Sequence, residues 1–278
     1  DVVRYSTSME NFPTPTFDSY LSPVRNLRAG RLTDVETALS AIKNNANILI
    51  SPGSGTPFRL LSALDESREH WNQLNIIGGL LLEPIAPLKH AGQPFYFSTW
   101  HGSRLYEPAA DGGFLQIIPA RYSQATTMFT KIGKRRADVV LTTVSLPGID
   151  GRLSLGTSVG SIIDAVRSAP LVIGQINPQM PYTYGAGELW PSAFDYLVEM
   201  EGPLPELRRA KPGETEQRIS GHVTNLVPNE ATLQFGIGSV PEAIIASLRN
   251  HHNLGIHSGM IGNGIIDLAE TGALTNDC

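Results

Sequence analysis

Short apolar runs without polar alternation recur along this chain and constrain its fold more than any other feature. They occupy residues 46–51, 75–82, 94–98, 114–117, 139–144 and 171–176. A strand that faces water on one side alternates apolar and polar residues, whereas a continuous Val/Ile/Leu run is typical of a strand buried on both faces. The sequence therefore predicts an α/β fold with an open, mainly parallel sheet and flanking helices.

Helical patterns fall between several of these runs. Helices are expected at residues 34–44, 58–67, 124–131 and 158–168. The first is predicted to begin after Thr33 as its N-cap, with Glu36 three residues later. Strand 46–51, the glycine-containing turn 52–57 and helix 58–67 together indicate a βα unit.

Changes in composition predict the domain organisation. Residues 1–30 carry Pro13 and Pro15 among polar residues and are expected to form an extended arm. Residues 31–202 are predicted to form an α/β domain, and 203–213 a linker, because that stretch is rich in Pro, Glu, Arg and Lys and has no apolar period. Residues 214–278 are predicted to begin a second, related α/β domain that is too short to complete a sheet of its own.

The second domain repeats the strand–turn–helix order of the first. Helices are expected at 214–226, 242–248 and 265–271, strands at 231–235 and 254–257, and glycine-containing turns at 236–241 and 258–264. The two domains are therefore expected to be related to each other.

The net charge argues against two classes of partner, and the cysteine count bears on disulfides and cellular location. The formal net charge of −5 and a pI near 5.8 argue against nucleic acid or an anionic membrane as a partner. The basic residues Lys131, Lys134, Arg135 and Arg136 are interpreted as a solvated helix end. No apolar run reaches the roughly 18 to 20 residues that span a bilayer. The single cysteine, Cys278, excludes an internal disulfide and favours a reducing, cytoplasmic location.

Two glycine-containing turns are the first candidates for chemistry. They read Gly53-Ser54-Gly55 and Gly236-Ile237-Gly238-Ser239, each between a predicted strand and a helix. Glycine lets the backbone approach an anion or a carbonyl oxygen, and the amides at a helix start favour negative charge. Glycine also serves tight βα turns by geometry alone, so both interpretations stay open. Neither turn has the third glycine of the dinucleotide fingerprint, and no Cys or His spacing indicates a metal site.

Several motifs in order resemble those of one enzyme family. They are residues 233–244, which include Gly-x-Gly-x-x-Pro from Gly236 to Pro241; residues 138–156; and Ile176-Asn-Pro-Gln-Met-Pro181. The sequence from about Leu32 onward is similar to acetyl-CoA hydrolases and 4-hydroxybutyrate CoA-transferases.

The resemblance implies a CoA-transferase-type fold with two related domains, an active site between them, and an acyl-CoA thioester as substrate rather than a bound cofactor. The second substrate would be a small carboxylate or water. The implied oxyanion and CoA-binding residues are Gly236, Ile237, Gly238, Ser239, Gly262, Asn263 and Gly264, and the implied pocket residues are Gly53, Ser54, Gly55, Tyr182 and Tyr184. The resemblance further implies a homo-oligomer, or completion of the second domain by additional C-terminal polypeptide.

The chain departs from the family pattern at one position. The family's catalytic glutamate lies in a segment that usually reads His-Thr-Glu-Met, and here the segment is His257-Ser258-Gly259-Met260. In the family this glutamate attacks the thioester and forms covalent intermediates, which divides one difficult exchange into easier steps. Gly259 offers no carboxylate, so that step cannot start from this position.

Three alternatives follow from this departure. The first is an enzyme that uses His257, Ser258, a water, or another carboxylate such as Glu188, Glu242 or Glu270. The second is a non-catalytic acyl-CoA-binding homologue or pseudo-subunit. The third keeps the topology but performs other chemistry, as the sugar-phosphate isomerases do. The motif match favours an acyl-CoA-processing function over the third alternative.

Overall fold

The computed structural model describes residues 32–130, 133, 135–207 and 211–277, and the chain divides into two compact units between Glu206 and Leu207. This division lies inside the stretch 203–213 that was predicted as a linker. The predicted arm, residues 1–30, lies outside the described residues, as do Lys131, Lys134 and Cys278.

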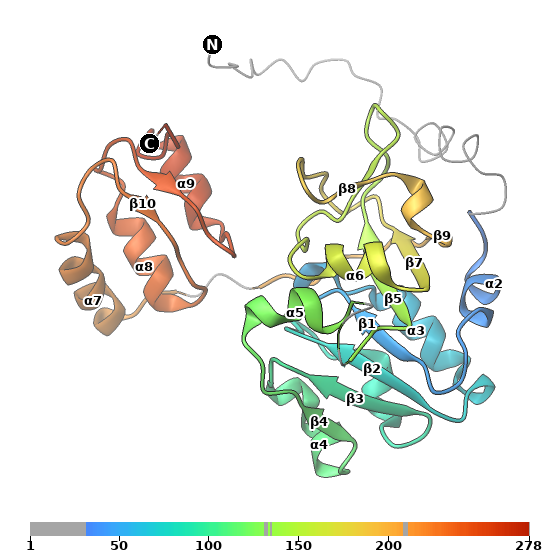
Figure 1. Cartoon of the computed structure of the whole chain (residues 1–278). Helices are drawn as coiled ribbons and strands as arrows, with labels where there is room; N and C mark the ends of the chain where they lie inside the picture. The colour runs from blue at the N-terminus through green and yellow to red at the C-terminus, as the bar shows by residue number, and fades with distance from the viewer. Residues whose placement is uncertain (1–31, 131–132, 134, 208–210, 278) are drawn as a thin grey trace. The chain divides into compact units, whose positions relative to one another are not determined.

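The first unit is built on one parallel sheet. Its seven strands are ordered β4-β3-β2-β1-β5-β7-β9 (Figure 1). Their bounds are β1 Asn47–Ile50, β2 Leu74–Gly78, β3 Phe95–Thr99, β4 Leu115–Ile117, β5 Val139–Val144, β7 Leu171–Ile176 and β9 Tyr196–Glu199. All six neighbouring pairs are parallel. The predicted mainly parallel sheet with flanking helices is therefore confirmed.

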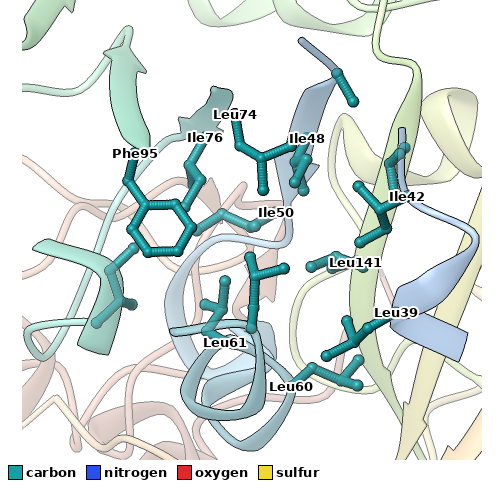
Figure 2. Packing of buried hydrophobic residues seen from close by; sticks show 14 of the residues in the cluster. Leu39, Ile42, Ile48, Ile50, Leu60, Leu61, Leu74, Ile76, Phe95 and Leu141 are labelled. Atoms are coloured by element: carbon teal, nitrogen blue, oxygen red, sulfur yellow. The ribbon is translucent and has the colours of Figure 1, made fainter. Parts of the chain in front are cut away.

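The central strands of the sheet are buried on both faces, which is the reason that they lack the apolar–polar alternation of a half-exposed strand. On β1, Ile48 and Ile50 belong to one buried cluster, whereas Leu49 belongs to the other. The first cluster is completed by helices α2 (Val35–Ser40), α3 (Phe58–Glu66) and α4 (Glu107–Asp111), and the second by α5 (Tyr122–Met128) and α6 (Ile162–Ser168). Figure 2 shows the first cluster, in which Leu60 and Leu61 of α3 pack against the strands.

Short 3-10 helices connect these elements. They are η1 Gly53–Gly55, η2 Arg68–His70, η3 Ala86–His90, η4 Arg104–Tyr106 and η5 Pro191–Ala193. Among the described residues, no helix combines the length and the apolar character needed to cross a bilayer.

The start of α2 corrects one prediction. Asp34, not Thr33, is the N-cap: its backbone is extended, and its carboxylate accepts a hydrogen bond from the Thr37 amide at 2.7 Å. The helix ends at Ser40 rather than at residue 44. Thr and Asp are both good N-cap residues, and the hydrogen bond to the Thr37 amide decides in favour of Asp34.

Three strands were not predicted. β9 completes one edge of the large sheet, and β6 (Leu153–Ser154) and β8 (Glu188–Leu189) form a separate antiparallel pair. β6 and β8 have two residues each, which is too short for an apolar period to appear in the sequence.

The second unit has its own small core. Helices α7 (Glu214–Thr224), α8 (Ser239–Ser247) and α9 (Gly264–Glu270) accompany the parallel strands β10 (Thr232–Leu233) and β11 (Gly255–Ile256). Leu248, Leu254 and Leu268 are fully buried in its apolar cluster. Helix α8 begins at Ser239, inside the segment predicted as turn 236–241, and both strands are shorter than expected.

Candidate functional site

The candidate residues of the second unit follow two neighbouring parallel strands. Thr232 pairs with Gly255 and Leu233 with Ile256, so the carboxyl ends of β10 and β11 lie at the same edge. The turn after β10 leads into α8, and the turn after β11 leads into α9. Ligands of open α/β sheets bind outside the carboxyl ends of the strands, so a site is expected at this edge.

Ser258 joins the two turns. Its hydroxyl donates a hydrogen bond to the carbonyl of Phe235 at 3.0 Å and accepts one from the Phe235 amide at 3.3 Å. It also accepts from the Met260 amide at 3.4 Å. The hydroxyl proton is thus directed at a carbonyl oxygen and not at a base, which gives Ser258 a structural function and does not favour it as a nucleophile. Neighbouring His257 donates its backbone amide to Leu233, and the residue is exposed.

Two glycines of these turns differ in whether the backbone conformation requires glycine. Gly238, the N-cap of α8, has φ of +123° and ψ of −178°, a conformation that is essentially restricted to glycine. Gly259 lies outside the left-handed region, and a Cβ built on it meets no atom within 4 Å. Backbone conformation therefore selects glycine at position 238, whereas the structure leaves space for a side chain at position 259.

Glu242 places a carboxylate beside the second turn. Its Oε1 lies 3.0 Å from where a Cβ of Gly262 would be, and its Oε2 lies 3.2 Å from the corresponding point of Gly264. The Gly264 position is also 2.9 Å from Cγ2 of Ile245, so the start of α9 packs closely on α8. The structure thus brings Gly262 and Gly264 together with the first turn of α8. Asn263 between them is the N-cap of α9, without a side-chain capping bond.

The remaining predicted residues of this unit lie in the first turn. Ile237 is exposed, and the hydroxyl of Ser239 donates to Oε1 of Glu216 at 3.3 Å. The other oxygen of Glu216 accepts from the Gly213 amide at 3.0 Å, at the start of α7. Helix α7 is therefore connected to the start of α8 through one glutamate, a contact that sequence reasoning missed because it joins residues 23 positions apart.

The first unit holds the other glycine turn, and its amides are already bonded. The Gly53 amide donates to the Leu80 carbonyl at 2.7 Å, and the Gly55 amide donates to the Ser158 hydroxyl at 3.1 Å. Ser158 in turn donates to the Pro52 carbonyl at 2.8 Å. These internal hydrogen bonds are enough to explain the shape of the turn. A substrate-binding function for Gly53, Ser54 and Gly55 stays a prediction.

Tyr182 belongs to a network of charged groups on the β6–β8 pair. Its hydroxyl donates to Oε1 of Glu188 at 2.8 Å, and the Gly185 amide donates to Oε2 at 2.8 Å. Arg152 contacts Oε1 of Glu188 at 3.3 Å and Oδ2 of Asp150 at 2.6 Å. The Gly185 amide, the Tyr182 hydroxyl and Arg152 together lower the pKa of Glu188 below its ordinary value. Desolvation and the neighbouring Glu188 raise the pKa of Tyr182, so its hydroxyl stays protonated.

Aromatic side chains surround this network. The ring of Tyr184 lies 5.2 Å from that of Tyr182 and is largely exposed. Arg152 lies 6.0 Å from the ring centre of Trp190, which is half-exposed. Tyr182 and Tyr184 were predicted as pocket residues. Of their ion-paired neighbours, Glu188 was named only as a candidate carboxylate and Arg152 was not named, because the contacts depend on the unpredicted pairing of β6 with β8.

No group of three His, Cys, Asp or Glu side chains with the geometry to hold a metal ion occurs within residues 32–277 where the structure describes them. The candidate residues thus fall into two groups, one in each unit. The group in the second unit combines turn amides, helix starts and one carboxylate, and the group in the first unit is an aromatic and ion-paired surface.

Comparison with known proteins assigns these features to a family. Residues 28–201 match the profile of the acetyl-CoA hydrolase/transferase N-terminal domain. The 4-hydroxybutyrate coenzyme A transferase of Clostridium kluyveri is 32% identical over 247 residues, covering 88% of this chain and 57% of that protein. The chain spans about half the length of the curated relatives that it matches.

Solved structures show the same fold. RipA from Yersinia pestis superposes with a TM-score of 0.84 at 26% identity, over 91% of this chain and 61% of that chain. The 4-hydroxybutyrate CoA-transferase from Porphyromonas gingivalis has a TM-score of 0.71 at 23% identity, over 90% of this chain and 59% of that one, and shares the fold. The matches extend through both compact units, and the resemblance read from the motifs is confirmed.

Proposed function

Because the chain belongs to the acetyl-CoA hydrolase/transferase family, we propose that it processes acyl-CoA thioesters, either by transferring CoA to a small carboxylate or by hydrolysis. Relatives named as CoA-transferases support the proposal, among them the Clostridium kluyveri protein. Coenzyme A thioesters are then substrates, and water or a carboxylate is the acceptor.

The observation that carries the proposal is the joining of the two turns at the carboxyl ends of β10 and β11. Attack on a thioester carbonyl develops negative charge on its oxygen, and preorganised amide donors at a helix start stabilise that charge. Helix α8 begins directly after Gly238, and the Ser258–Phe235 hydrogen bonds fix the adjacent turn relative to it. Gly236, Ile237, Gly238 and Ser239 are the proposed oxyanion residues, and Gly262, Asn263 and Gly264 the proposed contacts to CoA.

Tyr182 and Tyr184 are proposed as substrate-pocket residues of the first unit. Tyr182 and Tyr184 present flat aromatic surface, and Tyr182 is oriented by its bond to Glu188. The turn Gly53-Ser54-Gly55 is proposed as a further substrate-binding segment of the first unit.

The test uses the full natural polypeptide and a panel of short acyl-CoAs, each with and without acetate or succinate. Free CoA and new thioesters are followed by mass spectrometry. New thioesters that require the acceptor establish CoA transfer, and free CoA alone establishes hydrolysis. CoA binding without turnover contradicts both reactions and identifies a binding homologue.

We also propose that the protein is a homo-oligomer of the cytoplasm. The oligomer is proposed from the family resemblance. A single cysteine suits a reducing compartment. Light scattering of the full natural polypeptide tests the first point, because a monomer mass contradicts it, and cell fractionation tests the second.

A further inference from the structure

The backbone that carries Tyr182 and Tyr184 is anchored at the residue between them. The Thr183 amide donates to the hydroxyl of Ser154 at 3.1 Å, and the Thr183 carbonyl accepts from the same hydroxyl at 2.7 Å. Ser154 is fully buried in β6. The Thr183 hydroxyl donates to the carbonyl of Gly156 at 2.8 Å. The two tyrosines therefore extend from a fixed segment, and little ordering is needed when a ligand contacts them.

Tyr182 is held on two sides, whereas Tyr184 is open to solvent. The Tyr182 hydroxyl donates to Oε1 of Glu188 at 2.8 Å, and a Cβ added to Gly148 would lie 3.0 Å from the Tyr182 ring. The ring of Tyr184 lies 5.2 Å from that of Tyr182, and Tyr184 is 86% exposed. Tyr184 thus offers apolar ring surface that a ligand can bury.

The charged groups beside these rings are one guanidinium and two carboxylates. Arg152 contacts Oδ2 of Asp150 at 2.6 Å and Oε1 of Glu188 at 3.3 Å. Hydrogen bonds from the amide and the side chain of Arg152 lower the pKa of Asp150. The Gly185 amide and the Tyr182 hydroxyl lower the pKa of Glu188, so both carboxylates are ionised at neutral pH. The network therefore has a formal charge of about −1 at neutral pH.

An acyl group that carries a carboxylate is disfavoured beside this network. Arg152 is already shared between Asp150 and Glu188, and an added carboxylate would be repelled by both of its partners. The side chains of Arg152 and Asp150 are 35% and 43% exposed, so water and salt weaken this repulsion without removing it. An uncharged acyl chain meets no such repulsion and buries ring surface of Tyr184.

We propose that this surface selects acyl-CoAs whose acyl group is uncharged and apolar, such as butyryl, over those that carry a carboxylate, such as succinyl. Glu188 is then a specificity-determining residue, and Tyr184 supplies the apolar contact. This inference rests on the proposed acyl-CoA-processing function and on the proposed place of Tyr182 and Tyr184 in the substrate pocket. It concerns the acyl group alone and holds for transfer and for hydrolysis.

The experiment measures kcat/KM of the full natural polypeptide for butyryl-CoA and for succinyl-CoA, with acetate present. Wild type is expected to prefer butyryl-CoA at least ~10-fold, because placing like charges together is costly. Glu188→Gln removes the charge and keeps an oxygen that accepts from the Tyr182 hydroxyl. It is expected to raise kcat/KM for succinyl-CoA at least ~5-fold. Glu107→Gln, at an exposed position on α4, is the matched control and is expected to keep the wild-type ratio.

A series of acyl chains from acetyl to hexanoyl tests the apolar contact. Burial of each added CH₂ is expected to raise wild-type kcat/KM about two- to fourfold. Tyr184→Ala is expected to abolish most of this increase. Tyr122→Ala, which removes a ring that is 59% exposed on α5, is the control and is expected to keep the increase.

Ionic strength distinguishes charge repulsion from a loss of structure. In wild type, raising the salt concentration to about 0.5 M is expected to lower the preference for butyryl-CoA, because salt screens the two carboxylates. This dependence is expected to weaken in Glu188→Gln. Asp150→Asn removes the more exposed carboxylate and is expected to shift the preference in the same direction, which keeps the test open if Glu188→Gln does not fold.

The outcomes separate the inference from the proposed function. A wild-type preference below about threefold, or an unchanged preference in Glu188→Gln, overturns the inference and leaves the proposed function standing. An equal loss of kcat/KM for both substrates in Glu188→Gln identifies a residue that only supports the fold, which also contradicts the inference. If acyl-CoA binds without turnover, the ratio of the two Kd values from calorimetry replaces the ratio of kcat/KM. A wild-type polypeptide that neither binds nor converts any acyl-CoA overturns both.

Discussion

The Ser258 hydroxyl bonds to both the amide and the carbonyl of Phe235, at 3.3 and 3.0 Å. One side chain thus satisfies both backbone polar groups of the residue at which β10 gives way to its turn. The two turns at the candidate site are therefore held together by a hydroxyl group in addition to the strands, which have only two residues each.

Replacing Ser258 by alanine is expected to loosen this edge of the second unit. The Phe235 amide and carbonyl lose their partner, and each lost hydrogen bond costs about 0.5–1.5 kcal/mol. Hydrogen exchange at the Phe235 amide is expected to accelerate at least tenfold. Thr215→Ala, which changes an exposed hydroxyl on α7, is the control, and equal exchange in both variants contradicts the assigned function.

Introducing the family's glutamate at position 259 is expected to leave the fold intact and to add CoA transfer. A Cβ there meets no atom within 4 Å, and the backbone is outside the left-handed region. Gly259→Glu is expected to form new thioesters from an acyl-CoA and acetate, with an acyl- or CoA-linked peptide detectable by mass spectrometry. Gly259→Gln is the control without a nucleophile, and equal transfer by both variants excludes a covalent carboxylate step.

Gly238 provides the contrasting case. A Cβ there also meets nothing within 4 Å, but φ is +123°. Gly238→Ala is therefore expected to cost about 1–3 kcal/mol through backbone strain alone. Urea unfolding of the two variants Gly238→Ala and Gly259→Ala compares the same chemical change at the two positions. A stability loss of equal size in both would refute the assignment of different glycine requirements.

The Tyr182–Glu188 bond predicts a pH-dependent stability difference. The pKa of Glu188 is lowered in the folded protein, so this group stabilises the fold above its unfolded pKa, and the effect disappears as pH falls through the folded pKa. Tyr182→Phe removes one donor and is expected to raise the pKa of Glu188. The variant is expected to be less stable than wild type at pH 7 and to approach it on acidification. Chemical unfolding at several pH values measures this, with Tyr184→Phe as the control.

Two truncations of apolar side chains in the first unit are expected to differ strongly in their effect on the free energy of unfolding. Leu61 is fully buried under the sheet, whereas Ile117 on the edge strand β4 is 56% exposed. Leu61→Ala is expected to cost about 2–5 kcal/mol, because it removes buried contacts and leaves a cavity. Ile117→Ala is expected to cost less than about 1 kcal/mol. Equal urea midpoints for the two variants would contradict the assigned burial.

The sequence predicted the elements whose residues are buried on two faces. The bounds of β5 and β7 were predicted without error, because each is a mainly apolar segment without polar alternation. β9 and the β6–β8 pair were missed, since their stability comes from neighbours across the fold rather than from a period of their own. At α2, Thr33 and Asp34 are both competent caps, and only the backbone conformation selects Asp34.

The candidate site was predictable only in part, for a related reason. The turns were identified by their glycines and by the family motif. Sequence alone does not distinguish Gly238, which needs its conformation, from Gly259, which does not. The contact of Glu242 with Gly262 and Gly264 depends on how α8 packs on α9 through Ile245, a long-range arrangement that no local pattern encodes.

Ser158 has a consequence for how the first unit folds. It bonds to the Gly55 amide and to the Pro52 carbonyl across 103 and 106 positions of the chain. These two hydrogen bonds of the turn at Gly53–Gly55 therefore cannot form while β1 and α3 are the only elements present. These bonds form only after a loop that spans most of the unit has closed. The entropic cost of that closure is therefore incurred before the contacts contribute any stability. The turn that comes early in the chain is thus completed late in folding, together with the segment that leads into α6.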